Sequence, residues 1–320
     1  MAELLGLVSL FWALRRFQPT LVHAITIKAV LYAGIAGRLL GISRRLYAVS
    51  GLGYVFMERS LKAQVIRALV RPVYGFIAHG GGVRFIFQNR DDQAQIRDFL
   101  RWPPTRMAQQ SIVTAGSGVD LNQFSPALGW QSRGGAVRFV CATRLLKAKG
   151  VGEYIDAARQ VLAGFDTDDV HRPSFTLAGG LDEANQTGLT AVELDKLLDS
   201  SGVEYVGHQD NMAAFLRGFD VSVLLSHREG FPKALIEAAA SGLGIITTDV
   251  PGCRELKAFA PDATTLVAVQ NLPAAAQAFD KLARDPAGVA KMKQAARQAA
   301  EQHFGVEKIV ESHMALYEIT

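Results

Sequence analysis

The chain has 320 residues, of which 49% are hydrophobic and 20% are charged, a composition typical of one or two globular domains with large cores. The formal net charge is only +4, and no basic patch is interleaved with aromatic residues, so nucleic-acid binding is not indicated. The two cysteines, Cys141 and Cys253, form no disulfide framework or zinc spacing and predict a reducing, cytoplasmic setting.

The amino-terminal segment is rich in large apolar residues and is followed by Arg15 and Arg16. A signal peptide carries its positive charge before its apolar core, so secretion is not predicted. No apolar stretch approaches the roughly 18 residues that span a bilayer. Two interpretations stay open: an amphipathic helix packed on a sheet, or a helix lying in a membrane interface with its basic end near anionic lipid.

Strand-like runs alternate with helical runs along nearly the whole chain, which predicts a doubly wound α/β fold. The first half is expected to contain strands at 21–24, 45–49, 84–87 and 112–113, and helices at 29–40, 61–73 and 91–100. A weakly patterned, glycine-containing stretch at 125–135 is the expected linker. The second half restarts the pattern, with strands expected at 137–141, 174–178, 203–206, 221–225, 244–248 and 265–269. Helices are expected there at 151–162, 192–200, 212–217, 234–240, 272–284, 287–301 and 306–317.

Polar and glycine-rich residues follow several strands of the second half. In parallel sheets, ligands collect at the carboxyl ends of the strands. The segments concerned are 142–144, Gly179-Gly180, Gly207-His208 and 226–229. The second half is therefore predicted to hold the ligand.

The most informative of these segments is Glu229-Gly230-Phe231-Pro232, which joins the strand at 221–225 to the helix at 234–240. Backbone N–H groups near Phe231 and Pro232 begin that helix and favour anions, while a neighbouring carboxylate can accept hydrogen bonds from sugar hydroxyls. A second glutamate, Glu237, follows after seven intervening residues. Two glutamates at this spacing also occur by chance as solvated helix carboxylates, but this context suits a ligand with a polyol and a phosphate.

Together with Thr-Asp-Val-Pro-Gly-Cys-Arg-Glu at 248–255, this segment resembles the signature of the retaining glycosyltransferases of family 4, also called group 1. The resemblance implies a GT-B fold of two Rossmann-like domains and a nucleotide-sugar donor. Glu237 would bind the ribose hydroxyls and Glu229 the donor sugar. Donor contacts would also come from Gly230, Phe231 and Pro232, and the base pocket would be lined by Gly179, Gly180, Gly207 and His208. His208 is equally well explained as a surface residue of a turn.

The segment from Arg144 to Gly150 resembles the family's Arg-x4-Lys-Gly motif. Arg144 and Lys149 would then stabilise the leaving diphosphate, whose charge grows as the glycosidic bond breaks. The alternative is a solvated basic loop, and Lys147 is interpreted in that way. No Asp-x-Asp clamp stands in a suitable loop, so neither a metal nor a cofactor is expected, and the UDP-type sugar is the substrate.

The first half resembles the acceptor side of family members that assemble bacterial surface polysaccharides or lipid-linked oligosaccharides. The residues that the resemblance assigns to acceptor-side loops are Lys28, Gly51, Gly53, Asn89, Gly116 and Asp120. Many relatives carry His-x-His on the first matching strand, whereas here Ile25 replaces the second histidine. His23 is therefore either a catalytic residue or a core histidine.

The resemblance divides the chain into an incomplete acceptor-side domain (1–125), a donor-binding domain (126–305) and a crossover helix (306–320) that packs back on the first domain. By the same resemblance, the chain is expected to begin part-way into the family's first domain. A truncated reading frame, a complementing amino-terminal polypeptide or a vestigial acceptor half would each explain this.

The predicted activity is transfer of a hexose or N-acetylhexosamine from a UDP-type donor to a polyprenyl-linked glycan, at the cytoplasmic membrane face, in capsule or O-antigen synthesis. One alternative is a non-catalytic nucleotide-sugar-binding subunit. Another is a different GT-B enzyme, such as a phosphorylase or a sucrose-type synthase.

Overall fold

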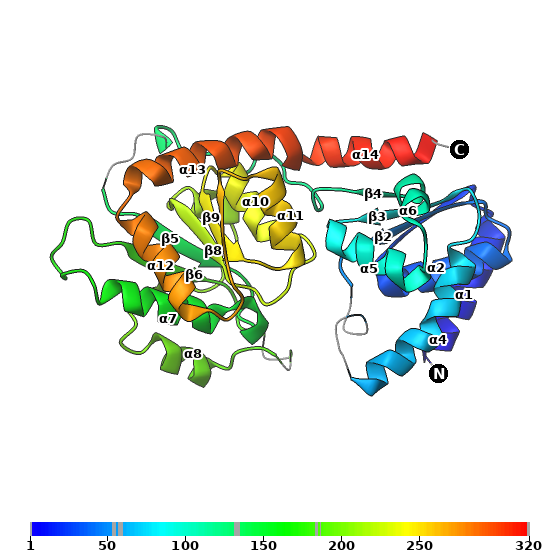
Figure 1. Cartoon of the computed structure of the whole chain (residues 1–320), viewed down its shortest axis with the longest axis horizontal. Helices are drawn as coiled ribbons and strands as arrows, with labels where there is room; N and C mark the ends of the chain where they lie inside the picture. Colours follow the sequence, from blue (N-terminus) through cyan, green and yellow to red (C-terminus); the bar gives the residue numbers. More distant parts are fainter. Residues whose placement is uncertain are drawn as a thin grey trace. The chain divides into compact units, whose positions relative to one another are not determined.

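The computed structural model describes residues 2–52, 56, 60–130, 135–182, 185 and 187–318. It divides into two compact units, each built on a parallel sheet with helices packed against it (Figure 1). Unit 1 comprises residues 1–116 and 309–320, and unit 2 comprises residues 117–308. The division along the chain thus falls at residue 116, ahead of the glycine-containing stretch at 125–135.

Unit 1 contains a four-stranded sheet in the order β1-β2-β3-β4. Its strands are β1 (Leu21–Ile25), β2 (Arg44–Val49), β3 (Val83–Phe87) and β4 (Ser111–Val113). Its helices are α1 (Ala2–Phe17), α2 (Ile27–Leu39), α4 (Leu61–Ile77), α5 (Arg90–Leu100) and α6 (Pro104–Gln110). The sequence pattern did not predict α6, which begins with a proline; proline is tolerated there because a first-turn N–H has no partner within the helix.

Alternate residues of β2 face the two sides of this sheet. Tyr47 belongs to an aromatic core with Phe85, at a ring-centroid distance of 5.4 Å, and this core also contains buried residues of α2 and α4. Leu46 instead packs with Ile86 and with Leu316 of α14 (Val306–Glu318). The period-two alternation of a strand therefore gives each face its own apolar surface, and the carboxyl-terminal helix covers one of them.

Unit 2 contains a six-stranded parallel sheet in the order β10-β9-β8-β5-β6-β7. Its strands are β5 (Arg138–Ala142), β6 (Ser174–Ala178), β7 (Val203–Tyr205), β8 (Val221–Leu224), β9 (Gly244–Thr248) and β10 (Thr264–Val267). The direction of strand addition reverses between β5 and β8. In doubly wound sheets this switch point is where ligands bind, beyond the carboxyl ends of the strands.

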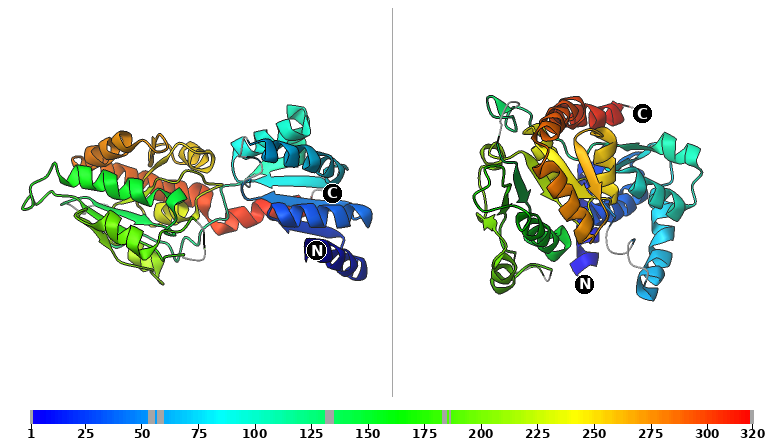
Figure 2. Two further views of the ribbon diagram at one scale, coloured as in Figure 1. Left: turned by 90° about the horizontal axis from the view of Figure 1, so that it is seen from below. Right: turned by 60° about the vertical axis from the view of Figure 1, so that its left-hand side comes forward.

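Helices cover both faces of the sheet in unit 2 (Figure 2). They are α7 (Val151–Leu162), α8 (Ala191–Leu198), α9 (Met212–Leu216), α10 (Lys233–Ala240), α11 (Pro251–Phe259), α12 (Leu272–Ala283) and α13 (Pro286–Ala299). Two short helical segments, η2 (Lys147–Lys149) and η3 (Ala300–Phe304), complete the unit. None of the described helices in either unit is long and apolar enough to cross a membrane.

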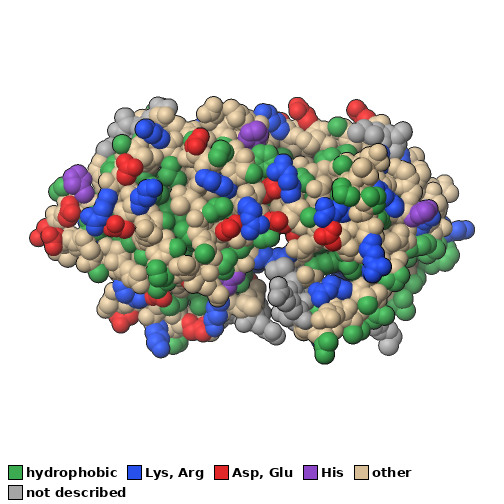
Figure 3. Space-filling view, in the orientation of Figure 1, with side chains coloured by type: hydrophobic (Ala, Val, Ile, Leu, Met, Phe, Trp, Pro, Cys, Tyr) green, Lys and Arg blue, Asp and Glu red, His purple; other side chains and the backbone are tan. Residues whose placement is uncertain are grey.

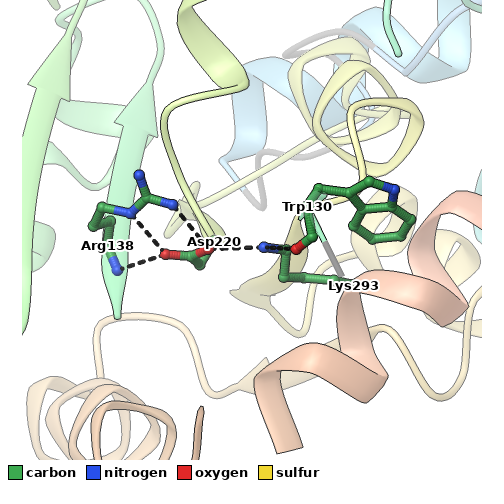
Figure 4. A network of polar contacts seen from close by, with 4 residues as sticks. All are labelled: Trp130, Arg138, Asp220 and Lys293. Atoms are coloured by element: carbon green, nitrogen blue, oxygen red, sulfur yellow. Dashed lines mark hydrogen bonds and ion pairs between the residues drawn. The ribbon is translucent and has the colours of Figure 1, made fainter. Parts of the chain in front are cut away.

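A buried network of charged residues lies at the amino-terminal edge of the unit 2 sheet (Figure 4). Asp220 accepts hydrogen bonds from Arg138 Nε at 2.9 Å and from Lys293 Nζ at 2.7 Å, and Lys293 also donates to the Trp130 carbonyl. Burial by itself would raise the pKa of Asp220, but the hydrogen bonds from Arg138 and Lys293 hold this pKa below its ordinary value. The network joins β5, β8 and α13 and borders a cavity of about 380 Å³. Because Asp220 is paired with both Arg138 and Lys293, we interpret this network as stabilising the fold.

Candidate active site

The loops that follow β8 and β5 meet at the switch point of unit 2. Glu229 lies on the loop between β8 and α10, and Lys149 ends η2, which follows β5. Lys149 Nζ lies 2.5 Å from Glu229 Oε1, and the two side chains are only 21% and 10% exposed. The structure therefore brings together two predicted site residues that are 80 positions apart in the sequence.

Gly150 allows this close approach. Its φ is +72°, and a Cβ atom at this position would lie 2.2 Å from the carbonyl oxygen of Leu225 at the end of β8. A hydrogen bond of 2.9 Å from His227 N to Ala148 O adds a second backbone contact. Because only glycine combines a left-handed backbone with no side chain, the family-like Lys-Gly pair holds the basic loop against the glutamate loop.

Ser226 fixes the carboxylate of Glu229. Its hydroxyl donates to Glu229 Oε1 at 2.6 Å, and the serine is completely buried. The sequence pattern did not predict a role for Ser226, although its position three residues before Glu229 lies within the motif. A carboxylate held by an ammonium group and a hydroxyl has one defined orientation before any ligand arrives.

The segment at 248–255 forms the support beneath this loop. Thr248 Oγ1 donates to the carbonyl oxygen of Ser226, and Gly252 N donates to the carbonyl oxygen of Glu229 at 3.1 Å. A Cβ atom on Gly252 would lie 2.4 Å from the carbonyl oxygen of Gly230, so no larger residue fits. The downstream half of the signature therefore positions the upstream half.

Glu237 lies in α10, and its side chain is 16% exposed. Burial raises the pKa of this carboxyl group above its ordinary value, although Lys233, at 3.6 Å, opposes the shift. A partly buried carboxylate with one long ion pair retains acceptor capacity for hydroxyl groups of a ligand.

The residues between the two glutamates contribute mainly backbone. The Phe231 side chain is buried, and its ring packs near those of Phe259 and Phe304, with centroid distances of 6.3 and 6.0 Å. Pro232 is the N-cap of α10, and no side chain caps the first turn. Leu235 N donates to the carbonyl oxygen of Pro232, whereas the N–H groups of Lys233 and Ala234 have no acceptor among the described residues and remain for an anion.

The predicted base-pocket turns follow the next two strands. Gly179 has a φ of +151°, and its missing Cβ would lie 1.9 Å from the carbonyl oxygen of Thr143. Gly179 N donates to the carbonyl oxygen of Gly207 at 2.9 Å, so the turns after β6 and β7 contact each other. Gly180 and His208 lie beside them. The His208 side chain is 72% exposed, which leaves both interpretations of it open.

The remaining basic residues of the loop differ from Lys149. Arg144 is exposed and follows β5 directly, whereas Lys147 points to Glu193 on α8 with an Nζ–Oε1 distance of 2.7 Å. A side chain with 58% exposure, as in Lys147, agrees with a solvated residue. His227, next to Ser226, is bound instead by Glu153 of α7 at 2.7 Å.

Three predicted acceptor-side residues follow strands of unit 1. Gly51 comes after β2, Asn89 after β3, and Gly116 after β4, so all three lie near the carboxyl edge of that sheet. Asn89 is buried and caps α5 through a 2.7 Å bond from Asp92 N to its side-chain oxygen. Gly53 lies outside the described residues.

The other first-half residues have contacts that the sequence did not indicate. Lys28 binds Glu3 of α1 at 2.7 Å, with both side chains mostly exposed. Asp120 falls in unit 2, where its carboxylate accepts from the backbone N–H groups at 122 and 123. His23 Nδ1 lies 2.7 Å from the Tyr317 hydroxyl, and its ring contacts His313, so it packs against α14. Burial and His313 lower the pKa of His23. Its catalytic role stays a prediction.

Within the described residues, no group of three or more His, Cys, Asp and Glu side chains could hold a metal ion. Cys141 and Cys253 are buried, and burial raises the pKa of each thiol to about 12, so neither is a reactive thiolate. Arg144 and Lys149 are the cations that the sequence predicts for the diphosphate.

Two family models match the chain. Residues 136–285 match the model described as glycosyl transferases group 1, and residues 2–79 match a model described as glycosyl transferase 4-like. Together they cover most of both units. The chain belongs to the glycosyltransferases, and its second unit matches group 1. The donor-side match spans the whole switch-point region, including the Lys149–Glu229 pair.

Curated relatives of this glycosyltransferase include two enzymes of known specificity. It is 25% identical over 256 residues to the N,N'-diacetylbacillosaminyl-diphospho-undecaprenol alpha-1,3-N-acetylgalactosaminyltransferase of Campylobacter jejuni, covering 76% of the chain and 62% of the relative. It is 23% identical over 261 residues to the UDP-Gal:alpha-D-GlcNAc-diphosphoundecaprenol alpha-1,3-galactosyltransferase of Escherichia coli, covering 78% and 63%. The chain thus spans somewhat less than two thirds of each relative.

Solved structures share the fold. Anabaena HepE in complex with UDP superimposes with a TM-score of 0.75 and 17% identity, covering 97% of this chain and 82% of that protein. Sucrose-phosphate synthase from Thermosynechococcus elongatus superimposes with a TM-score of 0.74 and 20% identity, covering 98% and 76%. The predicted fold, GT-B, is confirmed by these glycosyltransferase structures.

Proposed function

We propose that this glycosyltransferase moves a hexose or N-acetylhexosamine from a UDP-type donor to a polyprenyl-diphosphate-linked glycan. The observation that carries the proposal is the Lys149–Glu229 pair at the switch point, beside the uncapped amino terminus of α10. The names of the two curated relatives support a lipid-linked acceptor. The name of one of them, and the UDP complex of the Anabaena structure, support uridine as the base.

In the proposed mechanism each residue has one task. Glu237 accepts hydrogen bonds from the ribose, and Glu229 holds hydroxyls of the donor sugar. Arg144 and Lys149 bind the diphosphate, and their charge stabilises it as the bond from the anomeric carbon to the phosphate oxygen breaks. The acceptor hydroxyl attacks from the same face and forms the new glycosidic bond. Because attack and departure occur on one face, the anomeric configuration is retained, and the hydroxyl proton passes to the departing phosphate oxygen.

The acceptor would be reached at a membrane surface. Residues 1–116 contain 15 Lys and Arg and five Asp and Glu, which gives them a formal net charge of +10. Because the whole chain has a net charge of +4, residues 117–320 have a net charge of −6. Large apolar side chains on α1 and α4, including Leu4, Trp12, Leu61 and Leu69, are more than 60% exposed. Figure 3 shows hydrophobic and basic side chains gathered together over these helices. Such a surface suits an anionic lipid interface.

Incubation of the purified chain with UDP-sugars and a polyprenyl-diphosphate-linked saccharide tests the proposal. We expect an extended glycolipid, retention at the new linkage and activity in the presence of a chelator. Glu229→Gln should abolish transfer while UDP still binds. Transfer by the chain alone would exclude the non-catalytic alternative, whereas UDP binding without transfer until another polypeptide is added would favour it. Loss of all activity with chelator would contradict the metal-free mechanism.

A further inference from the structure

A glycine-rich loop of unit 1 lies at the opposite edge of the sheet from the proposed acceptor-side loops. His79-Gly80-Gly81-Gly82 joins the end of α4 to the start of β3, so it lies at the amino-terminal edge of the sheet. The proposed acceptor-side loops follow the carboxyl ends of the same strands. An open hollow of about 810 Å³ borders this loop and is also lined by Arg84, Arg106 and two glutamines of α6.

The backbone of the loop offers hydrogen-bond donors. Across the described residues, the N–H groups of Gly80, Gly81 and Gly82 have no protein acceptor. Gly80 has a φ of +119°, and a Cβ on Gly82 would lie 2.5 Å from the carbonyl oxygen of Ser43, so both positions require glycine. Successive N–H groups in such a loop form a concavity that binds anions.

Four guanidinium groups surround the loop. A Cβ built on Gly80 would lie 3.3 Å from Arg45 Nη2 and 3.8 Å from Arg38 Nη1, while Arg84 and Arg106 line the hollow itself. Among the residues described as lining this hollow, none is acidic. Among the described residues, none of the four arginines is paired with a carboxylate. Arg45, which is 2% exposed, donates to two backbone carbonyl oxygens and contacts Tyr47.

The carbonyl groups at the end of α4 are already used by these arginines. Arg45 donates to the carbonyl oxygens of Ile77 and His79, and Arg106 donates to that of Ala78. The carbonyl oxygens of Gly80 and Gly81 are likewise engaged, by Gln110 Nε2 at 3.1 Å and Arg84 Nη1 at 2.6 Å. The negative end of the helix dipole is thus capped, and the lining supplies positive charge and N–H donors. Arginine forks with backbone N–H groups are the donor set that phosphate oxygens fit.

We propose that this hollow is a phosphate-binding site, separate from the donor site, for a phosphomonoester or diphosphate group. The ligand could be carried by a lipid headgroup or free in solution, since both present the same oxygens. Apolar residues lie beside the guanidinium groups: Arg38 sits 5.8 Å from the centroid of the Phe76 ring, and both Phe76 and Leu39 are exposed. This neighbourhood suits a phosphate at the end of an acyl or prenyl chain.

Gly81 provides the sharpest test because a Cβ there meets nothing within 4 Å. Gly81→Asp places a negative charge in the hollow, and Gly81→Asn is its neutral match of the same shape. Inorganic pyrophosphate is titrated calorimetrically into both variants and their parent, with Arg144→Gln and Lys149→Gln present in all three to weaken donor-site binding. We expect saturable binding in the parent, little change in Gly81→Asn, and affinity at least about tenfold weaker in Gly81→Asp.

Equal affinities of the two variants, or no saturable binding by a folded parent, would overturn the proposal. Thermal unfolding establishes that each variant is folded. UDP binding by Gly81→Asp in the otherwise unchanged chain reports on the donor site independently, so failure of one site is distinguished from failure of the other.

A vesicle experiment identifies the source of the phosphate. Phosphatidylcholine vesicles with and without phosphatidic acid are sedimented with Gly81→Asp and Gly81→Asn. Phosphatidate-dependent binding that is selectively lost in Gly81→Asp, and that excess pyrophosphate competes away, assigns the site to a lipid headgroup. Equal vesicle binding of the two variants, together with different pyrophosphate affinities, assigns it to a free phosphate compound.

Discussion

Replacing Ser226 by alanine removes the hydroxyl that donates to Glu229 Oε1 at 2.6 Å. A hydrogen bond to a charged group contributes about 1.5–3 kcal/mol, which corresponds to about 10- to 150-fold in kcat/KM if the orientation of Glu229 matters in the transition state. Lys149 still holds the same oxygen at 2.5 Å, so the lower end of this range is expected. UDP lacks the sugar that Glu229 is proposed to hold, so its affinity should change by less than about twofold.

The assay compares kcat/KM for the UDP-sugar with calorimetric UDP affinity in the same preparations. Ser241→Ala is the matched control, because Ser241 is also buried but its hydroxyl has no hydrogen-bond partner in the described structure. A general effect of deleting a buried hydroxyl would appear in both variants. If Ser226→Ala retained full kcat/KM, or lost UDP affinity to the same extent as kcat/KM, the positioning role of Ser226 would be refuted.

Four further predictions follow from the geometry of unit 2. Asp220→Asn should lower the free energy of unfolding by about 3 kcal/mol because it leaves Lys293 buried without a carboxylate, and Lys293→Met added to it should recover most of the loss in urea unfolding. Because the folded-state pKa of Asp220 is lowered, its contribution is present above about pH 4 and should disappear as pH falls through the folded-state pKa. As the pH is lowered, UDP affinity should begin to fall at a higher pH than the titration of an ordinary glutamate would give, because burial raises the pKa of Glu237 and ribose binding needs the carboxylate. Glu237→Gln should remove this pH dependence. Gly150→Ala, whose Cβ would lie 2.2 Å from a backbone oxygen, should weaken UDP binding at least about tenfold, whereas Gly152→Ala, with its nearest contact at 3.9 Å, should bind normally.

The sequence predicted most helices and strands because each has a clear apolar period and a polar or glycine boundary. It also predicted that Glu229 and Lys149 follow strands, since both lie just after buried apolar runs. Their direct contact could not be derived from spacing alone. It depends on the strand order, which places β5 beside β8 although two other strands separate them in the chain.

Other features depend on side-chain directions that no periodicity contains. The hydrogen bond from Ser226 to Glu229 requires a particular rotamer, and the packing of His23 against Tyr317 requires α14 to lie on β1. Three consecutive glycines at 80–82 are visible in the sequence, but the arginines around them come from four separate segments. By contrast, the excess of basic residues in 1–116 is a simple count, and the net charge of the whole chain conceals it.

Calorimetric titration of UDP into the wild-type chain and into Glu237→Ala tests the proposed donor site most directly. We expect micromolar binding by the wild type and its loss in a folded Glu237→Ala variant. The substitution removes the carboxylate that accepts hydrogen bonds from the ribose, while Lys149 and Glu229 stay in place. Equal binding by both chains, or no binding of UDP by a folded wild type, would contradict the assignment of the donor site to the carboxyl edge of unit 2.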